Sequence, residues 1–299
     1  MTERILVTGG AGFIGSHLVE ALVARGASVR VLDNLSLGRR EWVHPEAEFI
    51  EGDIRSLDTC MNAVAGCEGV FHMAAMSRSA ASLEAIEICT SVNVLGTQNV
   101  LAAARRFGVR KLVYSGSSTY YGNQPVPHHE DLPGDFLNFY GLSKYVGEEY
   151  CLLFDRLYDV PAVVLRYFNV YGPRQPGEGV YALVLGIFLR RAAQNLPLMI
   201  HGSGEQRRDF IHVRDVAEAN IAAYESDTRA VRLNVGSGSN ISVKELADMI
   251  SSNQESGPRR PADAEATLAD VSRTHRMLGW KARVPLSEGI QELRELKEA

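Results

Sequence analysis

The sequence predicts an α/β protein with a doubly wound parallel sheet and a smaller C-terminal α/β lobe. Strand-like and helix-like segments alternate through the first half of the 299-residue chain. The first strand runs into a glycine-rich turn that opens a helix. After Gly172 prolines, glycines and charges interrupt this pattern. We therefore expect one domain over residues 1–170 and a second lobe over residues 171–299, some of whose segments return to the first.

The expected elements of the first domain follow one another at the spacing of strand–helix–strand units. Short apolar runs predict strands, and apolar residues three and four apart predict helices. The expected strands are Ile5–Val7, Val29–Leu32, Phe49–Glu51, Gly69–His72, Lys111–Ser115 and Ala162–Arg166. The expected helices are Ser16–Arg25, Leu57–Val64, Val92–Phe107 and Ser143–Tyr158. In the second lobe, Ser252–Asp263 is expected to be a loop because it is rich in Ser, Gly and Pro.

The turn after the first strand carries glycines at positions 9, 12 and 15. Glycines at this spacing let the backbone approach a pyrophosphate, which then lies at the N-terminus of the following helix. The second strand ends at Asp33, whose carboxylate can accept hydrogen bonds from both hydroxyls of an adenosine ribose. A 2′-phosphate would be repelled there, so the sequence predicts NAD as the cofactor rather than NADP.

Composition and charge exclude several other classes of protein. The formal net charge is −5 and there is no basic run, so nucleic acid is not an expected partner. The longest apolar run, Tyr181–Leu189, is too short to span a membrane, and the first strand begins too early for a signal peptide. Four scattered cysteines without a C-x-x-C pattern predict reduced thiols in the cytoplasm. No metal site is expected, since His128 and His129 have no acidic partner at ligand spacing.

A tyrosine and a lysine predict the chemistry. Tyr140 and Lys144 are four residues apart at the start of a helix and therefore share one face. A neighbouring ammonium group favours the phenolate form of a tyrosine, and a phenolate can take a proton from a sugar hydroxyl while a hydride leaves. Upstream, the strand that begins at Lys111 runs into hydroxyl-bearing residues at 115 and 117–119. A doubly wound sheet places substrate contacts at this end of a strand.

Taken together, the motifs resemble the extended short-chain dehydrogenase/reductase family, in its nucleotide-sugar epimerase/dehydratase branch. The resemblance runs from residue 4 to about residue 290. Its motifs are Thr8–His17, Asp33–Ser36, Asp53–Ile54, His72–Ala75, Asn93–Thr97, Tyr140-x-x-x-Lys144, Leu165–Gln175, Arg208–Phe210 and Asn234–Gly236. It implies a Rossmann domain with tightly bound NAD and a UDP-sugar substrate. It also implies a homodimer formed through the helices predicted at Val92–Phe107 and Ser143–Tyr158.

The resemblance also implies roles for individual residues. Tyr140 is the implied base, with Ser117 and Lys144 as its catalytic partners. The residues implied to bind NAD are Gly9, Gly12, Phe13, Ile14, Gly15, Asp33, Asn34, Ser36, Gly38, Asp53, Ile54, Met73, Ala74, Ala75, Ser115, Tyr140, Lys144 and Tyr167. Those implied to bind the UDP-sugar are Arg78, Ser117, Ser118, Thr119, Tyr140, Asn169, Met199, His201, Arg208, Arg260, Asp263 and Thr267. His72 and Asn93 are expected to be structural.

The residues after Ser117 discriminate between reactions of the branch. Dehydratases and decarboxylases resemble one another in carrying carboxylates there, whereas this chain has Ser118 and Thr119. The resemblance therefore favours 4-epimerisation of a UDP-hexose, in which C4 is oxidised, the 4-keto sugar rotates and the hydride returns to the other face. Asn169 favours neutral sugars such as those of UDP-glucose and UDP-galactose. Thr267 is a small residue at the position that gates the sugar pocket in relatives, so it would leave room for an N-acetyl group.

Three alternatives stay open. Arg78 could be the cation for an acidic sugar, as a UDP-glucuronate 4-epimerase would need. An NAD(P)-dependent reductase of a keto-sugar nucleotide would use the same residues but consume reduced cofactor. A non-enzymatic NAD-sensing regulator would not need Ser117, Tyr140 and Lys144, so their presence argues against it. One departure from the family pattern is Phe139, which stands where a proline is usual.

Overall fold

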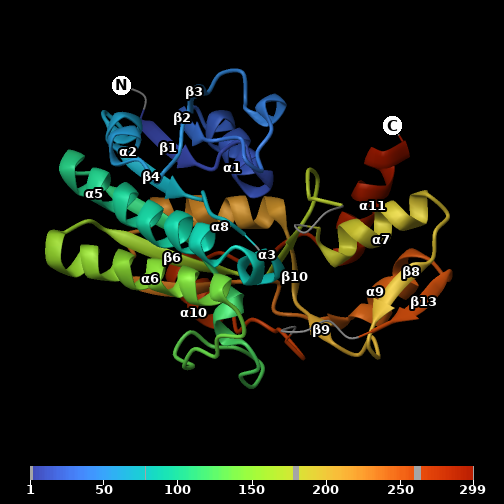
Figure 1. Cartoon of the computed structure of the whole chain (residues 1–299). Helices are drawn as coiled ribbons and strands as arrows, with labels where there is room; N and C mark the ends of the chain where they lie inside the picture. The colour runs from blue at the N-terminus through green and yellow to red at the C-terminus, as the bar shows by residue number, and fades with distance from the viewer. Residues whose placement is uncertain (1–2, 78, 178–181, 259–263, 299) are drawn as a thin grey trace.

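A seven-stranded parallel sheet forms the centre of the larger lobe (Figure 1). The computed structural model describes residues 3–77, 79–177, 182–258 and 264–298. In spatial order the strands are β3 (Glu48–Glu51), β2 (Ser28–Asp33), β1 (Arg4–Thr8), β4 (Gly69–His72), β5 (Lys111–Ser117), β6 (Ala162–Tyr167) and β11 (Val231–Val235). Every pairing in the sheet is parallel. The predicted fold class is therefore confirmed.

Helices cover both faces of this sheet. On one face, α1 (Phe13–Ala24) and α8 (Val213–Glu225) pack together against the apolar side chains of β1, β2 and β6. On the other face lie α2 (Leu57–Val64), α5 (Thr97–Phe107) and α6 (Phe139–Tyr158). Buried valines and leucines fill both layers, as expected of strands that are covered on two sides.

The strand order reverses between β1 and β4. From β1 the chain winds outward to β2 and β3, and then returns to β4 and winds the other way. Such a reversal leaves a crevice at the carboxyl ends of the strands, because the connecting helices on its two sides lie on opposite faces. This crevice is where the fold is expected to bind a ligand.

The helix predicted over Val92–Phe107 has an irregular first part. After α3 (Ser79–Glu84) and α4 (Ile86–Thr90), the chain forms a π-helical segment over Ser91–Gly96 before α5 begins. Within it, the Asn93 amide accepts from the backbone N–H of Met76 at 2.8 Å and donates to the carbonyl of the same residue at 3.0 Å. Asn93 is 1% exposed, in line with the structural role expected for it.

The smaller lobe has a core of its own between helices and short strands. Its elements are α7 (Val184–Ala193), β8 (Leu198–His201), α9 (Val243–Ile250), β13 (Gln254–Gly257) and α11 (Leu286–Glu298). In Figure 1 they lie to the right of the large sheet. Buried apolar residues such as Phe188, Leu198 and Leu246 hold them together.

The remaining elements are short. They are the 3-10 turns η1 (Arg40–Trp42) and η3 (Ser118–Tyr121), the strands β7 (Asn169–Tyr171), β9 (Arg207–Arg208), β10 (Phe210–His212) and β12 (Ile241–Ser242), and the helix α10 (Ser272–Leu278). β7 pairs with β10 in parallel, and β9 pairs with β12 antiparallel. The chain returns to the larger lobe with α8 and β11, which lie late in the sequence.

The prediction of a loop over Ser252–Asp263 is wrong in part. Residues Gln254–Gly257 form β13, which pairs in parallel with β8, while residues 259–263 lie outside the described part of the chain. Apolar alternation was absent because β13 forms through its backbone and keeps polar side chains half-buried or exposed. The pairing partner that makes it a strand is more than fifty residues away.

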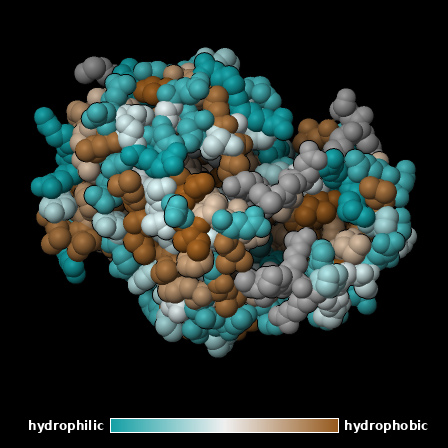
Figure 2. Space-filling model, in the orientation of Figure 1, coloured by the Kyte–Doolittle hydropathy of each residue, from teal (hydrophilic) through white to brown (hydrophobic). Residues whose placement is uncertain are grey.

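The surface and the cysteines agree with the composition. All four cysteines are free and buried. None of the helices in the described ranges is both long and apolar enough to cross a membrane. Figure 2 shows apolar side chains on the face formed by α3 to α6. Exposed large apolar residues of α6 include Leu142, Leu153 and Leu157.

Candidate active site

A cleft of ≈ 1370 Å³ lies at the carboxyl ends of the sheet strands. Its walls come from the loops after β1, β2, β4 and β5, from the start of α6, and from the segment that follows β6. Every residue predicted to bind NAD lines this cleft. The crevice expected at the strand reversal is therefore present, and its volume is large enough for an extended ligand.

The turn after β1 is a cradle that only glycine permits at two positions. Gly9 has φ of 71°, and a Cβ on it would lie 2.7 Å from the backbone nitrogen of Ala74. A Cβ on Gly15 would lie 2.1 Å from the Gly9 carbonyl oxygen. Gly12 caps α1 without any side-chain hydrogen bond, so the amides of the first helical turn have no internal partner. These features fit a dinucleotide pyrophosphate.

Asp33 ends β2 at the same end of the cleft. Its carboxylate accepts hydrogen bonds from the backbone N–H groups of Ala11 at 3.0 Å and Leu35 at 2.9 Å. Burial raises the pKa of Asp33 above its ordinary value, while both backbone donors oppose that shift. The carboxylate is thus fixed at the edge of the glycine cradle, as ribose recognition requires.

Asp53 lies nearby in a more exposed position. Asn34 donates to its carboxylate at 2.9 Å, and Arg55 donates to it at 2.7 Å. The hydrogen bonds from Arg55 lower the pKa of Asp53 to about 2. This carboxylate therefore stays ionised at any physiological pH and holds the loop between β2 and β3 in place.

The middle of the cleft is formed by the segment after β4. Thr8 Oγ1 accepts from the backbone N–H groups of Met73 and Ala74, both at 3.2 Å, and lies 2.8 Å from Nδ1 of His72. His72 is fully buried, and its Nε2 lies 3.0 Å from Oγ1 of Thr97. Burial lowers the pKa of His72 to about 3, so it remains neutral. His72 is thus a core residue, as expected, and it supports the trough rather than reacting.

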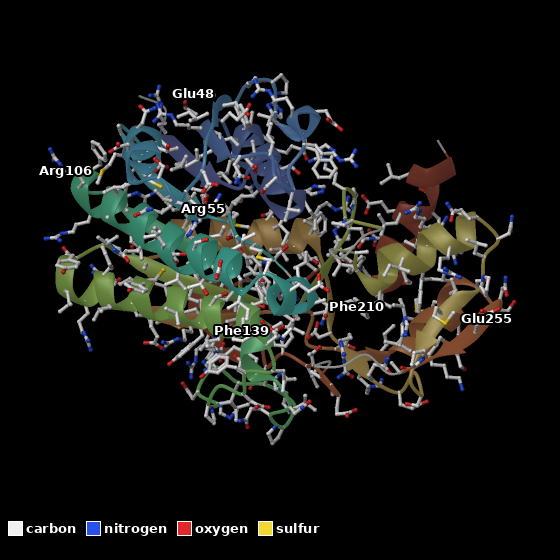
Figure 3. The ribbon with its side chains drawn as sticks, in the orientation of Figure 1. Glu48, Arg55, Arg106, Phe139, Phe210 and Glu255 are labelled. Atoms are coloured by element: carbon white, nitrogen blue, oxygen red, sulfur yellow. The ribbon has the colours of Figure 1, made fainter. Side chains whose placement is uncertain are left out.

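The proposed base sits in the first turn of α6. Asn138 caps this helix by accepting from the backbone N–H of Gly141 at 2.9 Å, and the Tyr140 N–H donates to Ser82 Oγ at 3.1 Å. Phe139 occupies the first helical position, where proline is favoured, and Figure 3 shows it at the start of α6. The Asn138 cap starts the helix at this point without the proline.

Lys144 lies one turn further along α6 and is 3% exposed. Its Nζ is 4.2 Å from the centre of the Tyr114 ring, which offers a cation–π contact. Burial lowers the pKa of Lys144 to about 8, and the nearby Glu148 carboxylate opposes this shift. A lysine in this setting is still mostly protonated at neutral pH and can stabilise a negative oxygen beside it.

Hydroxyl groups face these residues from the end of β5. Ser117 is the last residue of the strand, and its Oγ lies 2.8 Å from Oγ1 of Thr119. Ser117, Ser118 and Thr119 all line the cleft together with Tyr140 and Lys144. Residues 118 and 119 bring no carboxylate to this wall. The five side chains can bind and deprotonate a hydroxyl group.

A buried ion pair lies beneath this wall, and no role for it was predicted. Arg166 of β6 donates to Glu148 of α6 at 2.8 Å, and both side chains are at most 1% exposed. The Arg166 guanidinium lies 3.6 Å from the ring centre of Tyr120 and donates to the Tyr121 hydroxyl at 3.0 Å. It thereby ties η3, which follows Ser117, to the helix that carries Tyr140. The only sequence signal for this ion pair was that Arg166 lies within the motif Leu165–Gln175.

The structure does not bring all predicted substrate residues to the cleft. Ser117, Ser118, Thr119, Tyr140 and Asn169 line it, whereas Met199, His201, Arg208 and Thr267 do not. His201 Nδ1 lies 2.9 Å from the Pro258 carbonyl, and Arg208 donates to the Arg207 carbonyl at 2.8 Å. Arg78, Arg260 and Asp263 lie outside the described residues.

Other residues line the cleft without having been predicted. Two of them, Arg174 and Gln175, lie in the motif after β7, and Arg190 lies on α7. Arg174 also donates to Ser16 Oγ at 2.9 Å and pairs with Glu20, so it links the cleft to α1. Trp42 and Leu37, from the segment after β2, also line the cleft. In the described ranges no three His, Cys, Asp or Glu residues are grouped so that they could hold a metal ion.

Comparison with known proteins identifies the family. The model of the NAD dependent epimerase/dehydratase family matches residues 5–236. UDP-glucose 4-epimerase of Mycolicibacterium smegmatis is 37% identical over 301 residues, covering 96% of this chain and 96% of that protein. Relatives in the same family also include a UDP-N-acetylglucosamine 4-epimerase at 30% identity and a UDP-glucuronate 4-epimerase at 31%.

Two crystal structures extend the likeness to the whole fold. UDP-glucose 4-epimerase of Thermotoga maritima with UDP-glucose is 34% identical, with a TM-score of 0.95 over 99% of this chain and 98% of that one. UDP-glucose 4-epimerase of Thermus thermophilus with NAD is 35% identical, with a TM-score of 0.91 over 98% of both chains. NAD is the cofactor, as predicted from Asp33 and the glycine cradle. The chain belongs to the NAD-dependent epimerase/dehydratase family.

Proposed function

We propose that this enzyme interconverts UDP-glucose and UDP-galactose by epimerisation at C4. The observation that carries the proposal is the wall on which Ser117, Tyr140 and Lys144 share one cleft with the glycine cradle. Ser118 and Thr119, the two residues after Ser117, carry hydroxyl groups. These can bind a sugar but cannot serve as the acid and base of a dehydration. The relatives named as UDP-glucose 4-epimerases support the same reaction.

The residues of the wall divide the work of the reaction. Tyr140 as phenolate removes the proton from the sugar 4-hydroxyl, and Ser117 holds the same oxygen through its own hydroxyl. Lys144, charged and nearly buried, stabilises the phenolate before the proton transfer. When bound, NAD would supply the hydride acceptor for C4 and would be regenerated in each turnover. After the 4-keto sugar has rotated, Tyr140 returns the proton to the oxygen on the new face.

The choice of sugar rests on Asn169. Its amide is a neutral group at the cleft wall, which suits hydroxyl groups better than a carboxylate. This favours UDP-glucose and UDP-galactose over UDP-glucuronate. The N-acetyl sugars remain a second candidate, because relatives with this fold include a UDP-N-acetylglucosamine 4-epimerase.

The test uses the purified protein without added cofactor. UDP-galactose, UDP-N-acetylgalactosamine and UDP-glucuronate are incubated separately, and the products are resolved by chromatography. Conversion of UDP-galactose to UDP-glucose, faster than conversion of the other two, is the expected result. No epimer from any sugar after NAD has been supplied contradicts the proposal. Stoichiometric consumption of NADH or NADPH with a 4-keto sugar nucleotide would indicate a reductase instead.

We also propose a homodimer formed through α5 and α6. Exposed apolar side chains on these helices, among them Phe107, Leu153 and Leu157, support it. Light scattering is expected to give a mass near twice 32.8 kDa. A monomeric mass at micromolar concentration contradicts this assembly. Leu153→Glu, on the exposed face of α6, is expected to yield the monomer.

A further inference from the structure

The side-chain amide of Asn169 is held at both of its N–H groups. Asn169 begins β7 and lines the cleft. Its Nδ2 donates to the Asp209 carbonyl at 3.1 Å and to Thr267 Oγ1 at 3.0 Å. The backbone N–H of Asn169 donates to the same Asp209 carbonyl at 3.0 Å.

The chemistry of these partners fixes which way the amide points. A backbone carbonyl can only accept, so the amide atom beside Asp209 must be the nitrogen. A flipped amide would place two acceptors 3.1 Å apart without a proton between them. Nitrogen therefore faces the protein, and the carbonyl oxygen Oδ1 is left to face the cleft. No residue in the described ranges donates a hydrogen bond to it.

Thr267 supplies the second anchor. It is 9% exposed, does not line the cleft, and its Oγ1 also accepts from the backbone N–H of Asp209 at 3.2 Å. Asp209 is itself fixed, because its carboxylate accepts from the backbone N–H groups of Ser237, Gly238 and Ala269 at 2.8–3.1 Å. The hydroxyl thus holds Asn169 from a rigid position behind the cleft wall.

We propose that Thr267 is a positioning residue that makes Asn169 present a hydrogen-bond acceptor to the sugar. An acceptor favours a ligand that brings an O–H or N–H group and disfavours one that brings a carboxylate. Thr267 would then set sugar preference through Asn169 rather than by leaving space in the pocket. The proposal rests on the proposed function for the identity of the ligand as a UDP-sugar.

The test measures binding to the NAD-loaded enzyme by calorimetry. The two probes are UDP-glucose and UDP-glucuronate, and the quantity is the ratio of their Kd values. Wild type is expected to prefer UDP-glucose. In Thr267→Val the amide keeps only its Asp209 anchor and is held less firmly, so Oδ1 is presented less well and this preference is expected to fall about three- to tenfold. Thr267→Ser restores the hydroxyl and is expected to restore most of the preference.

A double-mutant cycle separates this role from a general loss of stability. If Thr267 acts through Asn169, then Thr267→Val has no further effect on the ratio in an Asn169→Ala background. Thr274→Val is the matched control, since this buried threonine of α10 donates to the Asn234 carbonyl of β11, outside the cleft. It should lower stability without changing the ratio. Should Thr267→Val fail to fold, Thr267→Ala replaces it in the same cycle.

Each outcome has a clear meaning. An unchanged ratio in Thr267→Val, or equal effects of Thr267→Val with and without Asn169, overturns the proposal. Failure of both sugar nucleotides to bind the wild type overturns it as well. If the wild type binds UDP-glucose with the expected preference but epimerises no sugar, the proposed function fails while the role of Thr267 stands.

Discussion

The two ends of the cleft are built in different ways. At the NAD end the chain uses backbone, with glycines where a Cβ would collide with the main chain. At the end that we propose to bind the sugar, here called the sugar end, it uses side chains, which are aligned by hydrogen bonds from distant segments. Asn169 depends on Asp209 and Thr267, and Lys144 lies over the ring of Tyr114. The first kind of site is local in the sequence, and the second is assembled only by the fold.

This difference predicts how each end fails. The glycine cradle has no side chain to remove, so a substitution there can only add atoms. We expect such an addition to abolish NAD binding. The sugar end is damaged by removing or neutralising single groups, and its losses are graded.

Adding one methyl group at Gly15 is expected to have the largest effect. The Cβ of Gly15→Ala would lie 2.1 Å from the Gly9 carbonyl oxygen, so the turn must open and the pyrophosphate site is lost. The purified variant is expected to carry no measurable NAD and to be about 1–3 kcal/mol less stable. The bound NAD is measured by releasing it through denaturation, and the loss of stability is measured by a thermal melt. Gly177→Ala is the control, because its nearest neighbour would be 3.4 Å away. Normal NAD content in Gly15→Ala would remove the contrast between the two ends.

Removing one hydroxyl at the sugar end is expected to lower turnover strongly but to leave cofactor binding intact. Tyr140→Phe deletes the proposed base, which should lower kcat by about 10²–10⁴-fold while NAD stays bound. Tyr150→Phe on the same helix, outside the cleft lining, serves as the control. Turnover in Tyr140→Phe close to that of the wild type would show that another group takes the proton.

The smallest of these effects is a pH dependence. Burial lowers the pKa of Lys144 to about 8, so raising the pH through that value removes the charge beside Tyr140. We expect kcat/KM to fall about tenfold per pH unit above this point. The groups facing Lys144 include Glu148, which is paired with Arg166, and the buried Cys89 and Cys151.

Unfolding does not explain such a fall. Lys144 has a lower pKa in the folded protein than in the unfolded chain, so its own contribution makes folding more favourable as the pH rises from about 8 toward 10.5. Circular dichroism at each pH checks this. A profile that stays flat to pH 10 contradicts the role of the charge.

The same contrast decides what could be predicted from the sequence. The six strands expected in the first half were found with ends shifted by at most two residues, and α2 was found as predicted. The residues predicted to bind NAD line one cleft, and most of them lie at or just after the ends of strands. Apolar runs and glycine turns are local signals, and they are strong where an element is buried on two sides.

What the sequence did not reveal depends on long-range pairing. β11 was not expected, because its place beside β6 comes from a strand more than sixty residues earlier. β13 was missed since its side chains are polar and only its backbone is used. The two hydrogen bonds from the Asn169 amide to Asp209 and Thr267 join three segments that are far apart in the chain. Neither residue type nor spacing in the sequence indicates them.

The position of β11 at the edge of the large sheet has a consequence for biosynthesis. β6 is complete at Tyr167, but its outer partner begins only at Val231. At 5–20 residues per second, the ribosome needs roughly 3–13 seconds to make the intervening chain. During that time the nascent sheet exposes the unpaired backbone of β6, which is a template for joining other chains. The late return of β11 therefore covers the edge of β6, and cutting the gene between the lobes would leave that edge unpaired and free to associate with other chains.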